Sequence, residues 1–279
     1  MIRNVNLQAA LVSVVLLIVL LGAWEWSIEG AILPGAQEEL SEYEQLTGGP
    51  SSGSSIPAPS AVIEHAIAEL SNPFYVAGSN DMGIGWQLAY SVGRVAIGYS
   101  LAVLVAVPIG FVIGMSPVMY KALNPYIQIL RPISPLAWMP LALFIIRDSG
   151  ASSIFVIFIC SLWPVMLNTA FGVASVSRDL LNVARTLELS AIKTAFTVIL
   201  PAAAPTIMTG MRIAIGISWL VIVAAEMLVG GSGVGYYIWA EWNNLDLTAV
   251  IFTILVIGVV GMFLDSLLAA AARMVRYDG

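Results

Sequence analysis

Six apolar stretches, each long enough to cross a lipid bilayer, restrict the fold of this chain more than any other feature of its sequence. A transmembrane helix needs about 20 consecutive, mostly apolar residues. The stretches lie at about residues 7–24, 86–114, 118–146, 151–174, 206–229 and 247–271. We therefore predict an all-α integral membrane protein with six transmembrane helices.

Composition agrees with a protein that uses the bilayer as its solvent. Hydrophobic residues make up 59% of the 279 residues and charged residues only 10%, with a mean hydropathy of +0.92. Soluble domains carry about 25% charged residues, so this chain has too few polar side chains to cover a water-soluble surface. The net charge of −6 argues against a nucleic-acid partner, because nucleic acids select basic surfaces.

The scarcity of reactive side chains argues against an enzyme. The sequence has one cysteine, Cys160, and one histidine, His65. A membrane-embedded enzyme would need histidine, aspartate or cysteine clustered near one face, and a metal site would need several such ligands together. We expect no catalytic residue, no metal site and no cofactor bound by this chain.

The N-terminal region combines a membrane anchor with a long polar loop. We interpret residues 1–26 as a retained transmembrane helix, because the apolar run is long for a signal peptide and ends at the interfacial aromatic residues Trp24 and Trp26. Residues 27–84 are acidic, then rich in Gly, Ser and Pro, then briefly amphipathic. We predict an extracytoplasmic, flexible loop that ends in a helix lying on the membrane surface.

That surface helix has a start signal and an apolar face. Ser60 is a candidate N-cap. The residues that share one helical face are Val62, Ile63, Ala66, Ile67 and Leu70.

Residues 85–272 are expected to form a membrane core of five further helices. Gly93 and Gly98 in its first helix would let a neighbouring helix approach closely. The third of the six spans should be kinked or broken, because prolines interrupt a helical hydrogen-bond ladder. These prolines are Pro125, Pro132, Pro135 and Pro140.

Lysine and arginine fix the expected orientation, since cytoplasmic loops carry the excess of positive charge. With the N-terminus inside, only Arg147 among the clearly flanking basic residues lies outside. The short tail 273–279 is then cytoplasmic too. The residues placed in the cytoplasm are Arg3, Lys121, Arg178, Arg185, Lys193, Arg273 and Arg276.

The cytoplasmic segment between the fourth and fifth spans, about residues 176–201, is too polar to cross the membrane and too apolar to float freely. Its apolar residues recur at helical spacing. Such a helix either fits a groove on a partner protein or lies on the lipid surface, and the pattern alone does not decide between them. The apolar positions are Leu180, Leu181, Ala184, Leu187 and Ala191.

At this segment the sequence resembles the permease subunits of ABC-type importers. Their cytoplasmic signature begins Glu-Ala-Ala, has a glycine four residues on, and ends near Leu-Pro. Here Ala184 and Pro201 keep that spacing, whereas Asn182 stands at the glutamate and Glu188 at the glycine. The resemblance implies a coupling helix at about 177–195 that docks on an ATPase. The implied contact residues are Asn182, Val183, Ala184, Arg185, Leu187, Glu188, Leu200 and Pro201.

The resemblance extends over about residues 60–272 and is greatest to the nitrate/sulfonate/taurine group, within it to the nitrate or bicarbonate branch. Segments such as LRPISPLAWMPLALF and the EWNNLD loop carry it. It implies the type I importer fold, a second permease copy (a homodimer by default), two cytoplasmic ATPases that bind ATP and Mg, an extracytoplasmic solute-binding protein and an inner-membrane location.

The expected function is import of a small anion, with nitrate or nitrite first. Bicarbonate, or sulfonate and taurine, are alternatives, and an uncoupled channel is a remote one. The chain lacks the GxxxxGK[ST] phosphate loop, so we expect it not to hydrolyse ATP, and we interpret GGSGVG at 230–235 as a flexible turn.

Charged residues inside spans are costly and often functional. Arginines in or beside the spans suit an anion, although each could instead pair with an acid such as Glu226 or reach an interface. The candidate pathway residues are Arg94, Arg131, Ser134, Trp138, Arg212 and Glu226, and Pro135, Trp163 and Asn168 are further possible lining residues.

Overall fold

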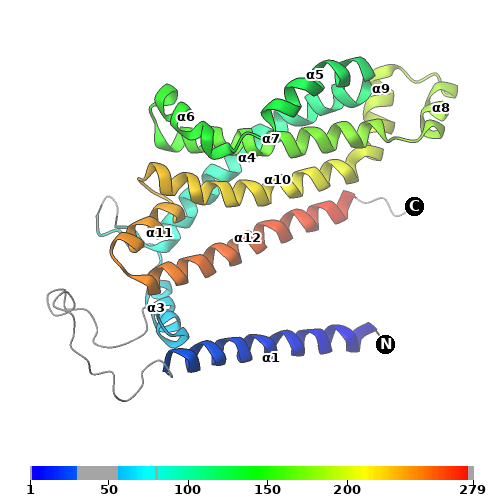
Figure 1. Cartoon of the computed structure of the whole chain (residues 1–279). Helices are drawn as coiled ribbons and strands as arrows, with labels where there is room; N and C mark the ends of the chain where they lie inside the picture. The colour runs from blue at the N-terminus through cyan, green and yellow to red at the C-terminus, as the bar shows by residue number, and fades with distance from the viewer. Residues whose placement is uncertain (1, 30–55, 79–80, 276–279) are drawn as a thin grey trace. The chain divides into compact units, whose positions relative to one another are not determined.

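The computed structural model describes residues 2–29, 56–78 and 81–275, which are helical apart from one bridge between Val76 and Met82 (Figure 1). The helices are α1 (Ile2–Glu29), α3 (Pro59–Ser71), α4 (Ile84–Met115), α5 (Pro117–Leu130), the 3₁₀ helix η1 (Pro135–Trp138), α6 (Met139–Ile146), α7 (Ser149–Ala174), α8 (Arg178–Thr186), α9 (Ala191–Thr194), the π-helical η2 (Ala195–Ile199), α10 (Leu200–Val229), α11 (Val234–Asn243) and α12 (Leu247–Val275).

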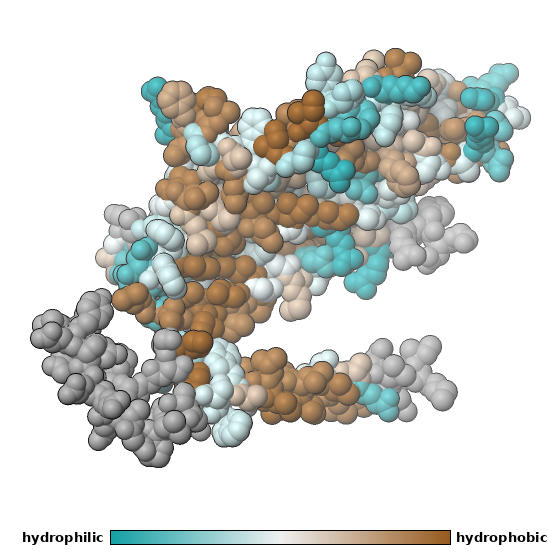
Figure 2. Space-filling view, in the orientation of Figure 1, coloured by the Kyte–Doolittle hydropathy of each residue, from teal (hydrophilic) through white to brown (hydrophobic). Residues whose placement is uncertain are grey.

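Five of these helices are long and apolar enough to cross a membrane, and α5 with the η1–α6 segment makes a sixth span that is bent by 83°. The six-span prediction is therefore confirmed, including the break in the third span. Figure 2 shows hydrophobic side chains along the long helices and hydrophilic ones around α8.

The break in the third span follows from its prolines. Pro132 lies in the turn after α5, and Pro135 opens η1 after an extended Ser134. Pro140 lies at the start of α6, where the first N–H groups have no intrahelical partner, so proline costs little there. The chain thus stops one helix and starts another inside a single span.

The chain divides into two compact units. The first contains α1, α3 and residues Glu241–Ile254, and the second contains Pro73–Ala240 and the chain from Leu255 onward. In the first unit, α3 begins at Pro59 with Ala58 as its N-cap, so the prediction of Ser60 as the cap is wrong. Instead, the Ser60 N–H and hydroxyl donate to the Glu25 carboxylate of α1, at 3.2 and 2.7 Å. An acid from another helix satisfies the exposed donor that a cap would serve.

Only part of the predicted apolar face of α3 is buried. Val62 is buried, whereas Ile63, Ile67 and Leu70 are exposed and lie along one side of the helix. The placement of this helix on a membrane surface stays a prediction.

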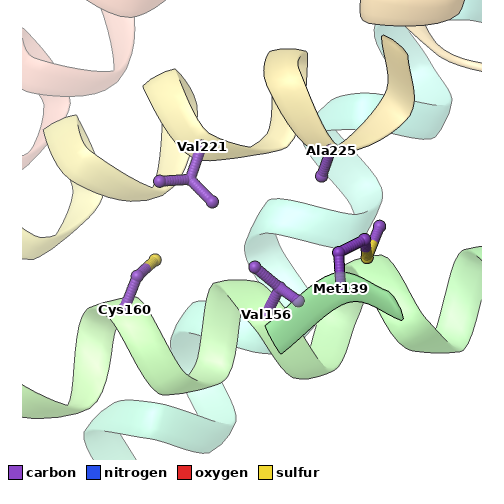
Figure 3. Packing of buried hydrophobic residues seen from close by; sticks show 5 residues of the cluster. All are labelled: Met139, Val156, Cys160, Val221 and Ala225. Carbon is purple, nitrogen blue, oxygen red and sulfur yellow. The ribbon is translucent and has the colours of Figure 1, made fainter. Parts of the chain in front are cut away.

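In the second unit, α7 packs against both α4 and α10, and the contacts depend on small residues. A Cβ on Gly98 would lie 2.7 Å from the Ile154 carbonyl oxygen and 2.8 Å from the Ile157 Cβ, so Gly98 is the close approach that we expected. Gly93 faces open space within the described residues, so that part of the expectation is wrong. Figure 3 shows the apolar contact of α6, α7 and α10, formed by Met139, Val156, Cys160, Val221 and Ala225.

The fifth span begins earlier than we predicted. The segments α9, η2 and α10 form one continuous helix, Ala191–Val229, that contains Pro201 and Pro205. Prolines remove two helical N–H donors, and the wider π turn at η2 lies directly before the first of them. The polar loop expected after GGSGVG contains the short helix α11.

Candidate functional site

A cavity of about 530 Å³ opens inside the second unit, between the break in the third span, α7 and α10. Arg131, the residue directly after α5, lies on its wall. Since α5 has 14 residues, it is about 21 Å long, which places Arg131 well away from the end at which α5 begins. The lining includes Arg131, Pro135, Cys160, Trp163, Asn168 and Ile213.

The cavity combines one free cation with neutral N–H groups. The Arg131 guanidinium has neither an ion pair nor a hydrogen bond with any residue that the structure describes. Trp163 and Asn168 carry side-chain N–H donors, and Asn168 is fixed by a 2.8 Å hydrogen bond to the Pro164 carbonyl. Such a cavity has donors for an anion and, among its lining residues, no carboxylate to repel one.

Arg94 and Glu226 form a buried ion pair between α4 and α10. Arg94 Nη1 donates to Glu226 Oε1 at 2.7 Å, and the two side chains are 15% and 1% exposed. Glu226 also accepts from the Ser91 hydroxyl at 2.8 Å and from the Gly235 N–H at 3.1 Å. The carboxylate therefore keeps a full set of donors despite its burial, as a stable buried charge requires.

The turn after α10 closes over this pair. Arg94 donates to the Ser232 carbonyl at 2.6 Å and to its hydroxyl at 2.8 Å. The Gly233 N–H donates to Gln87 Oε1 at 2.6 Å. Gly233 has φ +118°, and a Cβ there would collide with the Glu226 carboxylate. The GGSGVG glycines thus permit close contact with a buried acid, which the interpretation as a flexible turn did not include.

The third intramembrane arginine, Arg212, is paired differently. Its Nε and Nη2 donate to the two carboxylate oxygens of Asp265 on α12, each at 2.6 Å. The side chains are 50% and 46% exposed. This pair lies on an open face of α10 and α12 rather than between packed helices.

The remaining pathway candidates lie near the break. Ser134 is exposed between α5 and η1, whereas Trp138 packs against the α6–α7–α10 cluster. Of the candidates, Arg131, Pro135, Trp163 and Asn168 are brought together on one cavity, and Arg94 and Glu226 are brought together with each other. Roles in a solute path stay predictions for all of them.

Sequence reasoning missed the polar row on α4 that builds the buried network. Gln87, Ser91 and Arg94 follow one another at intervals of four and three residues, on one side of an otherwise apolar helix. This spacing was a usable signal, because polar residues on one stripe of a membrane helix face other protein groups rather than lipid.

The predicted coupling segment is a short helix, a turn and a second helix. Ser177 caps α8 by accepting from the Leu180 N–H, and Asp179 lies in the first turn. Leu181 and Ala184 face inward, toward a cluster around Val173 and Ile199. The exposed apolar residues Leu180, Val183 and Leu187 lie along the other side of the helix.

The turn that ends α8 shows which backbone conformation Glu188 adopts at the position where the permease signature has glycine. The Leu189 N–H donates to the Ala184 carbonyl and the Glu188 N–H to the Arg185 carbonyl, which is the Schellman pattern. Glu188 has φ +50°, the left-handed conformation that this motif requires and that glycine adopts without strain. The geometry of the glycine turn is therefore kept by a glutamate.

The other residues of the predicted contact set surround this turn. Asn182 and Arg185 are exposed, and Leu200 packs on the cluster beneath α8 with Pro201 beside it at the start of α10. In Figure 1, α8 and α9 lie at one end of α4, α7 and α10, and α6 lies at the other.

Comparison with known proteins identifies the class. Residues 106–277 match the family model described as "Binding-protein-dependent transport system inner membrane component". The chain belongs to this family, and it is a multi-pass inner-membrane permease of the ABC importer type.

Similar proteins include two nitrate import permease proteins NrtB. The one from Synechocystis sp. is 44% identical over 80% of this chain and 81% of its own length, and that from Leptolyngbya laminosa is 45% identical over 79% of each. A bicarbonate transport system permease protein CmpB from Synechocystis sp. is 43% identical over 73% of each chain.

Solved structures confirm the fold. A chain of the MetNI methionine ABC transporter in an inward-facing conformation matches with a TM-score of 0.60 at 13% identity, covering 68% of this chain and 94% of that one. A chain of an amino acid ABC transporter matches with a TM-score of 0.56 at 15% identity, covering 77% and 97%. The predicted type I importer fold is thereby confirmed.

Proposed function

We propose that this permease carries a small oxyanion across the membrane, with nitrate or nitrite as the first candidate. The observation that carries this proposal is the cavity at Arg131, which holds a guanidinium without a carboxylate partner among the described residues. The other two intramembrane arginines each have one. Arg131 is therefore the intramembrane arginine whose charge is available to a solute.

The chemistry of arginine favours a planar anion. Its guanidinium offers parallel N–H groups that fit two oxygens of one planar anion, and its charge persists at any physiological pH. Apolar residues such as Ile213 and Phe171 also line the cavity, and they offer no competing hydrogen-bond acceptor.

The relatives support nitrate and leave bicarbonate as the second candidate. Proteins named for nitrate import and for bicarbonate transport match this chain at similar identity. Both anions are planar and singly charged, so the Arg131 cavity suits either. Sulfonate or taurine remains the alternative from the wider group.

We further propose that α8 is the coupling helix. Its exposed row Leu180, Val183 and Leu187 is an apolar surface of the kind that fits a groove on a partner. The partners are two cytoplasmic ATPases, which hold ATP and Mg, together with a second permease copy and an extracytoplasmic binding protein. Both termini and α8 then lie in the cytoplasm, and this chain itself hydrolyses no ATP.

The test of the solute is the ATPase activity of the purified complex in lipid with its binding protein, against nitrate, nitrite, bicarbonate, taurine and alkanesulfonates. We expect stimulation by nitrate or nitrite. Stimulation by bicarbonate or a sulfonate alone would replace the solute and leave the permease assignment. In the same assay, Arg131→Gln should abolish stimulation and Arg131→Lys should retain part of it, whereas Arg147→Gln, at the end of α6 and outside the lining of this cavity, should behave as wild type.

The test of docking is co-purification of the ATPase with Leu187→Asp. A carboxylate in the apolar row should detach the ATPase while the permease stays folded. The matched control is Leu245→Asp, an equally exposed leucine in the loop after α11, which is predicted to lie outside. Unchanged co-purification of the Leu187 variant would refute the docking surface.

A further inference from the structure

The Arg212–Asp265 pair lies on the exposed surface of two membrane-spanning helices. Arg212 is in α10 and Asp265 in α12, and each side chain is about half exposed. Each residue is 17 or 18 positions from the end of its helix that is predicted to lie outside, which corresponds to roughly 26 Å. This distance is most of the hydrocarbon thickness of about 30 Å, so the pair lies near the cytoplasmic boundary of the bilayer, where half-exposed charges face water or other protein groups.

Two cavities adjoin the pair, one with a mixed polar and apolar lining and one with a mostly apolar lining. A cavity of about 710 Å³ between α10 and α12 is lined by Arg212 together with Thr209, Ser266 and Arg273. It therefore contains two cations and two hydroxyl groups. Such a lining suits a hydrated path for anions better than a contact with lipid.

This cavity region continues toward the Arg131 cavity. Ile213 and Ile217 line the Arg131 cavity, and the same two residues line a further cavity of about 570 Å³ that contains Arg212 and Asp265. Residues on one face of α10 therefore line both the cavity at Arg131 and the cavity at Arg212. With the N-terminus inside, Arg212 is the station nearer the cytoplasm.

The geometry of the pair is that of a bound oxyanion. Two parallel N–H donors hold the two oxygens of the Asp265 carboxylate at 2.6 Å each. Nitrate and bicarbonate also present two coplanar oxygens on one central atom, so either fits the same fork. The carboxylate occupies the position that a solute anion would take.

We infer that Arg212 is a second anion-binding station of the path and that Asp265 is its internal substitute for the solute. This inference rests on the proposed function. In the present structure Asp265 closes the station. When an anion arrives, it exchanges with the carboxylate, and the returning carboxylate later displaces it. Arg212 is paired with one anionic group in both states, so an anion passes without being trapped by an isolated arginine.

The test is anion binding by Asp265→Asn, which keeps the shape of the side chain and removes its charge. If Asp265 occupies Arg212 for more than about nine-tenths of the time, freeing the arginine lowers the apparent dissociation constant at least about tenfold. We expect the thermal midpoint of the purified complex to rise with millimolar sodium nitrate, relative to sodium gluconate, more in this variant than in wild type.

Two further variants isolate the station. The double variant Arg212→Gln, Asp265→Asn should lose the gain in the nitrate response and keep only the part that the Arg131 cavity contributes, which removes general salt effects from the comparison. Asp265→Glu, which keeps an internal carboxylate, should respond as wild type. Uptake by Asp265→Asn should fall roughly tenfold because the anion is released more slowly.

The outcomes separate this inference from the proposed solute. If Asp265→Asn and the double variant respond alike to nitrate while both still co-purify with the ATPase, the station is refuted. If the wild-type ATPase is stimulated by no oxyanion, yet Asp265→Asn gains nitrate binding that the double variant lacks, the station stands and the proposed solute fails.

Discussion

The ion pairs Arg94–Glu226 and Arg212–Asp265 join the same kinds of residue and have different roles. Arg94 and Glu226 are buried between α4 and α10 and make six hydrogen bonds, of which one joins the two residues and the other five go to Ser91, Ser232 and Gly235. Within the part of the chain that the structure describes, Arg212 and Asp265 bond only to each other, and both are about half exposed. The first pair holds helices and a turn together, and the second can open without disturbing the packing.

The difference shows that an arginine inside a membrane helix does not by itself mark a solute path. What matters is whether its guanidinium is already paired with a carboxylate of the protein. Arg94 is fully engaged, Arg212 is engaged by a group that can leave, and Arg131 has no partner among the described residues. The three form a series of increasing availability.

The largest effect should come from breaking the buried pair. Glu226→Leu leaves the Arg94 guanidinium buried without its carboxylate, which costs about 3–5 kcal/mol. We expect a large drop in the thermal midpoint of the complex in nanodiscs, and low yield. Asp265→Leu, the matched change in the exposed pair, should lower the midpoint far less. Equal drops would show that both pairs are structural.

A backbone change tests the same network without altering charge. Gly233→Ala places a methyl group against the Glu226 carboxylate at a residue with φ +118°, and we expect a loss of roughly 1–3 kcal/mol. Gly93→Ala meets nothing within 4 Å and should be neutral or stabilising by up to about 1 kcal/mol. The measurement is the thermal unfolding midpoint of the two variants, compared with wild type. An unchanged midpoint for Gly233→Ala would contradict the close contact between residue 233 and the Glu226 carboxylate.

A smaller effect is expected at the end of α8, which is far from both pairs in sequence. Glu188→Gly relieves left-handed backbone strain of about 1–2 kcal/mol and adds about 0.4–1 kcal/mol of unfolded-chain entropy, so a net stabilisation of up to about 1 kcal/mol is expected. Thermal unfolding measures it, with Arg185→Gly inside the helix as a control that should destabilise. A destabilised Glu188 variant would show that its side chain contributes more than its backbone costs.

The smallest effect concerns Glu241 on α11, a carboxylate with no arginine partner. Burial raises its pKa above the ordinary value of 4.5, and the nearby Asp246 acts in the same direction, while Asn244 opposes it. The folded state therefore holds the proton more tightly than the unfolded one, so this group's contribution to stability is largest at low pH and is lost as pH rises through the raised pKa. Midpoints measured upward from pH 4.5 should fall less in Glu241→Gln than in wild type, and identical slopes would contradict the assignment.

Local rules predicted the parts of the fold that local chemistry decides. Apolar length located the six spans, and Pro132 and Pro135 predicted the break, because proline affects the helix that contains it. The spacing of Leu180, Ala184 and Leu187 predicted α8. No local rule joins Arg94 to Glu226, which are 132 residues apart, or shows that Arg131 and Asn168 share a cavity. Those facts depend on how α4, α7 and α10 pack.

The interrupted third span also bears on how the protein is made. Its halves contain 14 and 8 helical residues, with η1 between them, and neither α5 nor α6 alone reaches the length of about 20 residues that a helix needs to cross the bilayer. A single residue, Ser116, joins α5 to α4, and α6 lies against α7. We therefore expect α5 and α6 to enter the bilayer together with the long helices next to them, α4 and α7. A ribosome-bound chain that ends before α7 should leave this span outside the hydrocarbon, to be completed only when the next helix is synthesised.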